Sequence, residues 1–151
     1  MERAAAVSKQ SKARRVKAVG SIAKHTRATV LLVDDDLSFL PAAARLIRSA
    51  GFTVMSFDRP SALLASDIPK TNACMVVDVH MPEMNGVELI GVLNESQRGL
   101  PVIMISGRND AETKRLIDRS HPVAALFKPI DEKALFEAID CALALSKDSL
   151  V

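Results

Sequence analysis

The sequence predicts an α/β fold, a doubly wound (βα)5 domain with one five-stranded parallel sheet. Five strand-like apolar runs start near residues 29, 52, 73, 102 and 123. The gaps between them are about twenty to thirty residues, which suits a crossover connection between parallel strands. All runs but the second are apolar throughout, as in strands that helices cover on both faces. Because crossovers are almost always right-handed, helices are expected on both faces of the sheet.

Helix-period patterns fill the gaps between the apolar runs. Gly51 is expected to end the first helix, Pro60 to open a short helix over 61–66, and Asp110 and Asp131 to cap the last two helices. Apolar residues recur at helical spacing in three of these segments. They are Leu40, Ala43, Ala44 and Ile47 in the first helix, Val87, Ile90 and Leu93 in the third, and Leu135, Ala138, Ile139 and Ala142 in the last.

Length and composition indicate one soluble domain. The chain has 151 residues, of which 48% are hydrophobic, enough for a core. No apolar run approaches the ~20 residues of a membrane helix, so no membrane insertion is expected. Cys74 and Cys141 both stand in apolar surroundings and are expected to be reduced core residues of a cytoplasmic protein. The three histidines are scattered, which argues against a histidine metal cluster.

The charge is distributed unevenly, although the net charge is only +2. Residues 1–27 hold eight lysines and arginines against one glutamate, whereas the rest of the chain holds twelve basic and seventeen acidic residues. Residues 1–27 are therefore expected to be a basic, flexible extension, which lacks the apolar stretch of a secretory signal. Residues 28–146 would form the domain, and 147–151 a short C-terminal tail.

Polar side chains follow four of the five apolar runs. They are Asp34, Asp35 and Asp36 after the first run, Asp78 after the third, Ser106 after the fourth and Lys128 after the fifth. Parallel strands bring these groups to one sheet edge, where open α/β sheets bind ligands. Two carboxylates ~4 Å apart repel by ~4 kcal/mol at an effective dielectric constant of about 20, so positive charge must offset them. Mg²⁺ and a lysine would do so, which indicates a metal-assisted phosphoryl site without a nucleotide-binding loop.

Four motifs in this order resemble the receiver domain of two-component response regulators, over residues 28–146. The motifs are Val-Asp-Asp-Asp at 33–36, Val-Asp-Val-His-Met-Pro-Glu-Met-Asn-Gly at 77–86, Pro-Val-Ile-Met-Ile-Ser-Gly at 101–107 and Phe-Lys-Pro at 127–129. The resemblance implies a flavodoxin-like sheet with strand order 2-1-3-4-5. It also suggests a single-domain regulator of the stand-alone type, since the sequence shows no effector domain.

The resemblance implies a role for each residue at the metal and phosphoryl positions. Asp78 would accept a phosphoryl group from a phosphohistidine of a histidine kinase or histidine phosphotransfer protein. Mg²⁺ would be the cofactor, bound by Asp34, Asp35, Asp78 and the backbone carbonyl of His80. The chain would then be a phosphorylated signalling protein, and its chemistry would be limited to phosphorylation of its own aspartate.

The remaining motif residues would form the switch. Ser106 would bind the phosphoryl group and move toward it, and Lys128 would pair with Asp78 or with the phosphate. The Lys128–Pro129 bond is often cis in such domains. The face made by the fourth helix, the fifth strand and the fifth helix would then repack for contact with an output protein or in a homodimer. Asp36 would be a helix cap.

Two positions depart from the family pattern. An aromatic residue commonly stands three positions before the lysine, but here that position is Ala125. Phe127 is the nearest aromatic and is expected to pack in the core. Residues 120–123 also lack the glycine that is common in the turn before this strand. These departures leave the output coupling, and whether the chain is a relay, a phosphate sink or an adaptor, open.

Two alternative functions remain at this point. The basic extension could bind nucleic acid and make the chain a DNA-associated regulator, although residues 1–27 contain no aromatic residue to stack on bases. Haloacid-dehalogenase-like phosphatases also use Mg²⁺ and two aspartates two positions apart, as Asp34 and Asp36 are. That alternative does not explain Asp78 and the proline and glycine that follow it.

Overall fold

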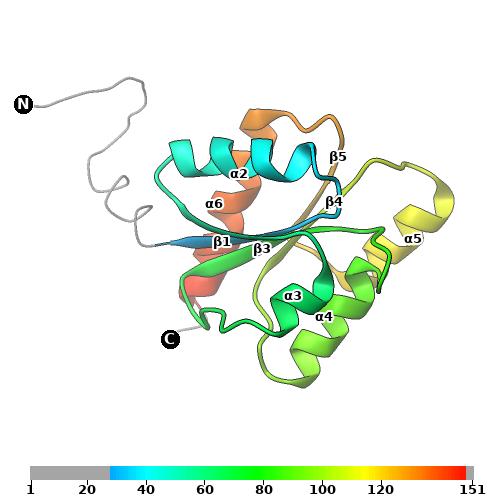
Figure 1. Ribbon diagram of the computed structural model, residues 1–151, viewed down its shortest axis with the longest axis horizontal. Helices are drawn as coiled ribbons and strands as arrows, with labels where there is room; N and C mark the ends of the chain where they lie inside the picture. The colour runs from blue at the N-terminus through cyan, green and yellow to red at the C-terminus, as the bar shows by residue number, and fades with distance from the viewer. Residues whose placement is uncertain (1–27, 149–151) are drawn as a thin grey trace, which may run out of the picture.

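The computed structural model describes residues 28–148 as a five-stranded parallel sheet covered by helices (Figure 1). The strand order is β2-β1-β3-β4-β5 and every neighbouring pair is parallel, which confirms the predicted fold and strand order. The elements are β1 (Thr29–Val33), α2 (Phe39–Ser49), β2 (Thr53–Phe57), α3 (Pro60–Leu64), β3 (Ala73–Asp78), α4 (Gly86–Glu95), β4 (Val102–Ser106), α5 (Ala111–Ser120), β5 (Ala124–Phe127) and α6 (Glu132–Asp148).

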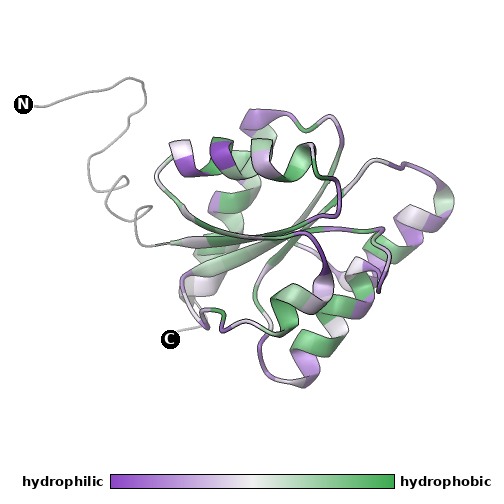
Figure 2. Ribbon diagram, viewed as in Figure 1, coloured by the Kyte–Doolittle hydropathy of each residue, from purple (hydrophilic) through white to green (hydrophobic). Residues whose placement is uncertain are grey.

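The helices form two layers, one on each face of the sheet. Helices α2 and α6 pack on one face of the sheet, and α3, α4 and α5 pack on the other (Figure 1). Each layer has its own buried cluster, because residues of one strand point alternately to the two faces. Leu32 of β1 belongs to the cluster under α2 and α6, and its neighbour Leu31 belongs to the cluster under α3, α4 and α5. In Figure 2 the strands and the inner helix faces are green, as expected for strands covered on both sides.

The strand register brings the ends of the strands to one edge. Val33, the last residue of β1, is paired with Val77, and Asp78 is paired with Ile105. Ser106, the last residue of β4, is paired with Phe127 of β5. The residues after each strand therefore emerge side by side at the carboxyl edge of the sheet. Adjacent parallel strands lie only ~5 Å apart, so side chains from neighbouring strands can meet there.

Side-chain caps begin most of the helices. Asp110 accepts a hydrogen bond from the Thr113 N–H (2.9 Å) and Asp131 from the Ala134 N–H (2.9 Å), which confirms both predicted caps. Asp36 accepts from the Ser38 and Phe39 N–H groups (3.0 and 3.1 Å) and so caps α2. Gly51 follows α2 with φ 99°, a left-handed conformation that suits a helix stop.

A reciprocal capping box that was not predicted begins α4. Asn85 accepts a hydrogen bond from the Glu88 N–H, and the Glu88 carboxylate accepts one from the Asn85 N–H, both at 2.8 Å. The Asn-x-x-Glu spacing in the sequence is the signal for this motif. The cap fixes the start of the helix that follows the loop after Asp78.

Two expectations about the core are wrong. Phe127 was expected to pack inside, but it is 36% exposed because it lies on the short edge strand β5. Cys141 is also exposed, since it lies on the outer side of α6, whereas Cys74 in the central strand β3 is buried as expected. Burial raises the pKa of the Cys74 thiol to about 12, so this cysteine stays protonated at neutral pH.

The described chain extends slightly beyond the expected domain end. Helix α6 continues to Asp148, two residues past the predicted boundary at 146. The predicted basic extension over 1–27 and the residues 149–151 lie outside the described residues. In the described range, none of the helices has the length and apolar character needed to cross a membrane.

The fold leaves no space for a side chain at Gly86, which follows the loop after Asp78. A Cβ atom there would lie 2.7 Å from the Asp78 backbone oxygen and 2.9 Å from the Met104 Cε atom. We therefore expect Gly86→Ala to lower the free energy of unfolding by about 1–3 kcal/mol in urea denaturation, because backbone and core must shift.

Gly91 in the same helix is the matched control. A Cβ atom there meets nothing within 4 Å, so Gly91→Ala should raise the free energy of unfolding by about 0.5–1 kcal/mol through helix propensity. Equal effects of the two substitutions would contradict the close approach at Gly86.

Candidate phosphoryl and metal site

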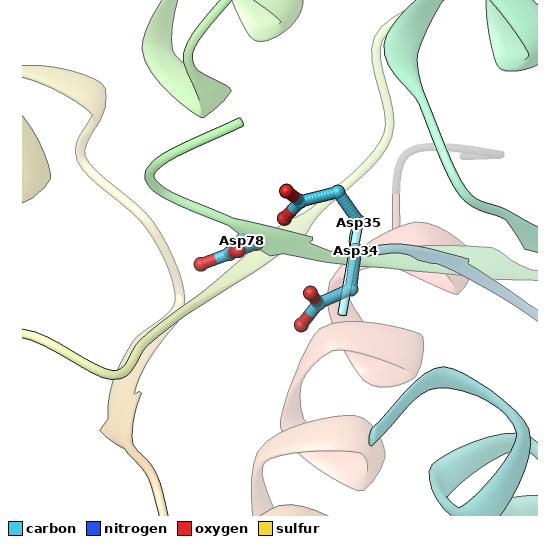
Figure 3. Close-up of side chains that lie close together, drawn as sticks. All are labelled: Asp34, Asp35 and Asp78. Atoms are coloured by element: carbon cyan, nitrogen blue, oxygen red, sulfur yellow. The ribbon is translucent and has the colours of Figure 1, made fainter. Parts of the chain in front are cut away.

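Three carboxylates meet at the carboxyl edge of the sheet. Asp34 and Asp35 follow β1, and Asp78 is the last residue of β3 (Figure 3). Ligand oxygens from the three side chains lie within 4.8 Å of one another, and this is the one such acidic cluster among the described residues. Asp34 is fully buried and Asp78 is 6% exposed, whereas Asp35 is exposed. The predicted cluster is therefore present, with one carboxylate open to solvent.

The Asp78 carboxyl resists ionisation in this arrangement. Its pKa is raised to about 7, first by burial and then by the neighbouring charges of Asp34 and, more weakly, Asp35. The Lys128 ammonium and a hydrogen bond from the His80 backbone act in the opposite direction. The site thus carries more negative charge than its own protein cation offsets, so a further cation would be stabilised there.

The Lys128 ammonium forms its short ion pair with Asp34 and not with Asp78. Its Nζ atom is 2.8 Å from Asp34 Oδ2 and 3.9 Å from Asp36 Oδ2. Asp34 Oδ1 accepts a hydrogen bond from the Asp36 N–H (2.9 Å). Asp34 Oδ2 is buried and accepts no hydrogen bond of good geometry from the described residues. This oxygen faces the Lys128 ammonium, and a carboxylate oxygen has a second lone pair that can bind a metal.

The donor set suits a hard divalent cation such as Mg²⁺. Carboxylate oxygens at close range, one of them solvent-exposed, allow a cation to keep part of its water shell, as Mg²⁺ prefers. No cysteine belongs to the cluster, and the His80 imidazole is engaged elsewhere. The ligand roles expected for Asp34, Asp35 and Asp78 stay predictions. The role expected for the His80 backbone carbonyl stays a prediction.

Ser106 lies at the end of β4 and is fully buried. Its hydroxyl accepts a hydrogen bond from the Arg108 N–H (2.9 Å), and its backbone oxygen accepts one from the Lys128 N–H (2.8 Å). Ser106 is thus connected both to the loop that precedes α5 and to the residue that carries the ammonium. The Lys128–Pro129 peptide is cis, as the resemblance implied.

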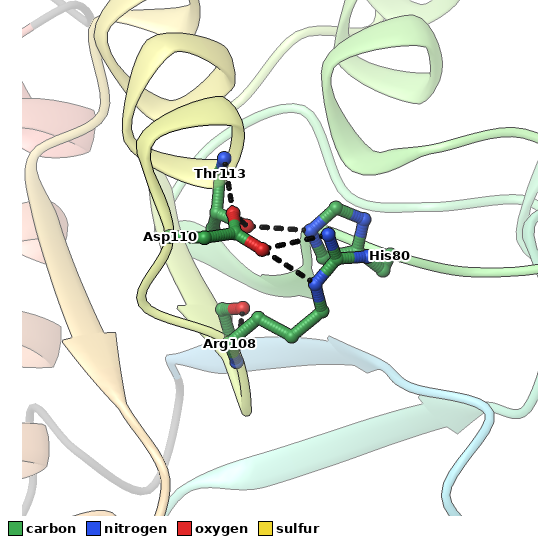
Figure 4. Close-up of polar contacts among 5 residues, drawn as sticks. His80, Arg108, Asp110 and Thr113 are labelled. Atoms are coloured by element: carbon green, nitrogen blue, oxygen red, sulfur yellow. Dashed lines mark hydrogen bonds and ion pairs between the residues drawn. The ribbon is translucent and has the colours of Figure 1, made fainter.

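A chain of polar contacts joins the loop after β3 to the start of α5 (Figure 4). His80 Nε2 lies 2.8 Å from Thr113 Oγ1. The Thr113 hydroxyl donates its single proton to Asp110 Oδ1 (2.6 Å), so it must accept from His80, which places a proton on Nε2. Arg108 Nε and Nη2 donate to Asp110 Oδ2 at 3.1 and 2.7 Å. Sequence reasoning missed this network, because residues 80 and 113 are distant in the chain.

An open pocket of about 350 Å³ lies beside the exposed Asp35. Apolar and charged side chains share its lining, and Leu37 among them is 71% exposed. The lining residues are Asp35, Leu37, Asp58, Arg59, Pro82 and Glu83. Asp35, the exposed member of the cluster, therefore lines an open pocket formed by the loops after β1, β2 and β3.

The geometry does not support the phosphatase alternative. That function needs Asp34 and Asp36 to act on one substrate, but only Asp34 belongs to the carboxylate cluster. One oxygen of Asp36 is occupied as the cap of α2, and hydrogen bonds from the Phe39 and Ser38 backbone lower the pKa of its carboxyl. Asp36 is thus a capping residue, as predicted.

The raised pKa of Asp78 predicts an inverse dependence of stability on pH in the metal-free protein. The carboxylate is less favourable in the fold than in the unfolded chain, so the free energy of unfolding should fall as pH rises from 3.8 to about 7. Asp78→Asn should remove most of this fall. Above neutral pH its free energy of unfolding should exceed that of the unsubstituted protein by about 1–3 kcal/mol. Urea denaturation with a chelator present measures both effects.

The exposed Asp118 on α5 provides the control. Asp118→Asn should leave the pH profile of unfolding unchanged. If the free energy of unfolding changed with pH in Asp78→Asn as it does in the unsubstituted protein, the raised pKa of the buried Asp78 carboxyl would be contradicted.

Comparisons with known proteins agree with this geometry. The response regulator protein TodT of Pseudomonas putida is 35% identical over 121 residues, which are 80% of this chain and 53% of TodT. The transcriptional regulatory protein TdiR of Thauera aromatica is 32% identical over 80% of this chain and 53% of its own length. The crystal structure of FixJ-N superposes with a TM-score of 0.70 at 30% identity, covering 78% of this chain and 94% of FixJ-N.

The chain spans about half the length of the curated relatives it matches. The family model described as the response regulator receiver domain matches residues 30–140, which include the whole carboxylate cluster, Ser106 and Lys128. This chain therefore belongs to the response regulator receiver domains, the signalling domains of two-component systems.

Proposed function

We propose that Asp78 accepts a phosphoryl group from a phosphohistidine on a histidine kinase or histidine phosphotransfer protein. The observation that carries the proposal is the meeting of three carboxylates within 4.8 Å, beside one ammonium, at the carboxyl edge of the sheet. Asp78 is the carboxylate at the centre of this edge, because β3 lies in the middle of the sheet. Asp78 is largely buried, but 6% of its surface is exposed to solvent.

The transfer is a displacement at phosphorus. An Asp78 carboxylate oxygen forms the new bond to phosphorus, and the bond between phosphorus and the donor imidazole nitrogen breaks. The electron pair of the broken bond stays on the imidazole, which takes up a proton. Because the transferred group is negatively charged and meets a carboxylate, positioning and charge neutralisation supply most of the rate. Lys128 and the Ser106 hydroxyl are the side chains proposed to supply them.

Mg²⁺ is the proposed cofactor, held by Asp34, Asp35, Asp78 and the backbone carbonyl of His80. Bound there, it would neutralise charge on the carboxylates and on the phosphoryl oxygens. The close approach of the three carboxylates supports this assignment. A cation near Asp78 also lowers the pKa of its carboxyl, which keeps the nucleophile ionised at neutral pH.

The proposed output is a rearrangement of the face formed by α5, β5 and α6. Ser106 now accepts the Arg108 N–H, so drawing its hydroxyl toward a phosphoryl group on Asp78 must break that bond. Arg108 also holds the Asp110 cap of α5, so the loop and the helix start are mechanically connected. Ala125 is partly buried and has no ring to swing inward. The loop is therefore the proposed route to α5.

Control of transcription is a candidate for the output of a longer assembly, since TdiR is named a transcriptional regulatory protein. The chain matches about half of the length of TdiR, so control of transcription stays a proposal for this chain. The predicted nucleic-acid contact of residues 1–27 stays a prediction, because that segment lies outside the described residues.

Phosphorylation can be tested with phosphoramidate and Mg²⁺ as a small-molecule donor. Intact-mass spectrometry should show the addition of one phosphoryl group, which hydroxylamine removes as it does other acyl phosphates. Asp78→Asn should take no label, because the nucleophilic carboxylate is gone, and omission of Mg²⁺ should abolish labelling. Asp118→Asn, on the surface of α5, should be labelled like the unsubstituted protein. Labelling that persisted in Asp78→Asn would contradict Asp78 as the phosphorylated residue.

The role of Ser106 can be separated from phosphorylation itself. In Ser106→Ala, labelling should continue at a reduced rate, but phosphorylation should no longer change amide hydrogen exchange in the loop after β4 and in the first turn of α5. The reason is that the hydroxyl connecting the phosphoryl group to that loop is missing. Ser120→Ala, at the other end of α5, is the control and should respond normally. A normal exchange response in Ser106→Ala would reject the proposed switch.

A further inference from the structure

Lys128 is held by three groups from one short segment of the chain. Asp34 and Asp36 provide carboxylate oxygens at 2.8 and 3.9 Å from the Nζ atom. The ring of Phe39 lies beneath the same ammonium, with its centroid 4.4 Å away. The Lys128 side chain is only 19% exposed, so these contacts are partly shielded from water. The surroundings of the ammonium are therefore set by the loop after β1 and the first residue of α2.

The cap of α2 brings Asp36 and Phe39 to the same side. Asp36 Oδ1 accepts the Phe39 N–H and the Ser38 N–H, while Asp36 Oδ2 faces the Lys128 ammonium. Phe39 is the first residue of α2 and packs against the core cluster beneath α2 and α6. Its ring is thus anchored on one side by apolar contacts and offers the other to the ammonium.

A lysine needs such support more than most site residues do. Its ammonium sits on a flexible four-carbon stem, which loses rotamer entropy when it is held in one place. A ring face attracts a cation through its quadrupole without carrying charge. It can therefore keep contact with the ammonium while the anionic partner of that ammonium changes.

We propose that Phe39 is the positioning residue for Lys128 and keeps its ammonium between Asp34 and the phosphoryl-accepting side chain of Asp78. The proposal rests on the function proposed above, in which Lys128 neutralises the transferred group. In the structure the ammonium is paired with Asp34, and a carboxylate oxygen of Asp34 lies within 4.8 Å of one of Asp78. A short turn of the lysine stem across the ring would exchange one anion for the other.

The inference is tested by comparing Phe39→Leu, which removes the ring, with Phe39→Tyr, which keeps it. In the unsubstituted protein the Lys128 Cε protons should show an upfield ring-current shift in ¹H–¹³C NMR spectra, assigned by its disappearance in Lys128→Met. Phe39→Tyr should retain the shift and Phe39→Leu should lose it. Phe39→Met is a second ring-free variant, in case the leucine substitution unfolds the domain.

The same variants are then labelled with phosphoramidate and Mg²⁺. The initial rate should fall about three- to tenfold in Phe39→Leu and stay within about twofold in Phe39→Tyr, in line with the strength of a partly shielded cation–π contact. In a Lys128→Met background, Phe39→Leu should have no further effect, because there is no ammonium left to position. A purely structural role of the ring would lower the rate equally in both backgrounds.

The outcomes separate this inference from the proposed function. If the unsubstituted protein is labelled and ring-free variants are labelled at the same rate, the positioning role of Phe39 is overturned while the phosphoacceptor role of Asp78 stands. An unchanged chemical shift of the Lys128 Cε protons in Phe39→Leu would also overturn it. If the unsubstituted protein takes no label at all, the proposed function falls, and this inference with it.

Discussion

Electrostatic repulsion among the carboxylates at the sheet edge is the constraint on which the site depends. The parallel register sets the ends of β1 and β3 side by side, and two of the three acidic side chains are buried there. Such a cluster is unfavourable unless cations offset it. The rest of the local structure answers this need through Lys128, which follows β5, and the proposed Mg²⁺ would add to it.

Because the carboxylates repel one another, the strands that carry them must be fixed by the core. Strands β1, β3 and β4 are buried along almost their whole length, so their ends cannot drift apart to relieve the repulsion. Gly86 closes the loop after Asp78 against the Asp78 backbone oxygen, where a side chain would not fit. The carboxylates already repel one another before any group is added. Adding or removing charge at such a site has a large structural effect.

The sequence was sufficient for the fold and for the three carboxylates that meet at the sheet edge, and insufficient for side-chain contacts. Apolar runs at crossover spacing carry their own signal, because every strand of a covered sheet must be apolar on both faces. Asp34, Asp78, Ser106 and Lys128 were found because each directly follows such a run.

The contacts that were missed depend on side-chain direction. The partner of Lys128 in the structure, the exposure of Phe127 and the bond between His80 and Thr113 follow from packing among segments far apart in the chain. Sequence periodicity records which face a residue occupies but not which neighbour it meets. The Asn85–Glu88 capping box is an exception, since its spacing was visible in the sequence.

The division of the core into two layers has an evolutionary consequence. The residues around the ammonium, Asp36 and Phe39, start a helix of one layer, whereas His80, Asp110 and Thr113 belong to loops and a helix on the other side. The sheet separates the two sets, and the Asp78 carboxyl is where they meet. If the proposed function holds, separate mutations on the two sides could alter the rate of phosphorylation and the response of α5 with little effect on each other.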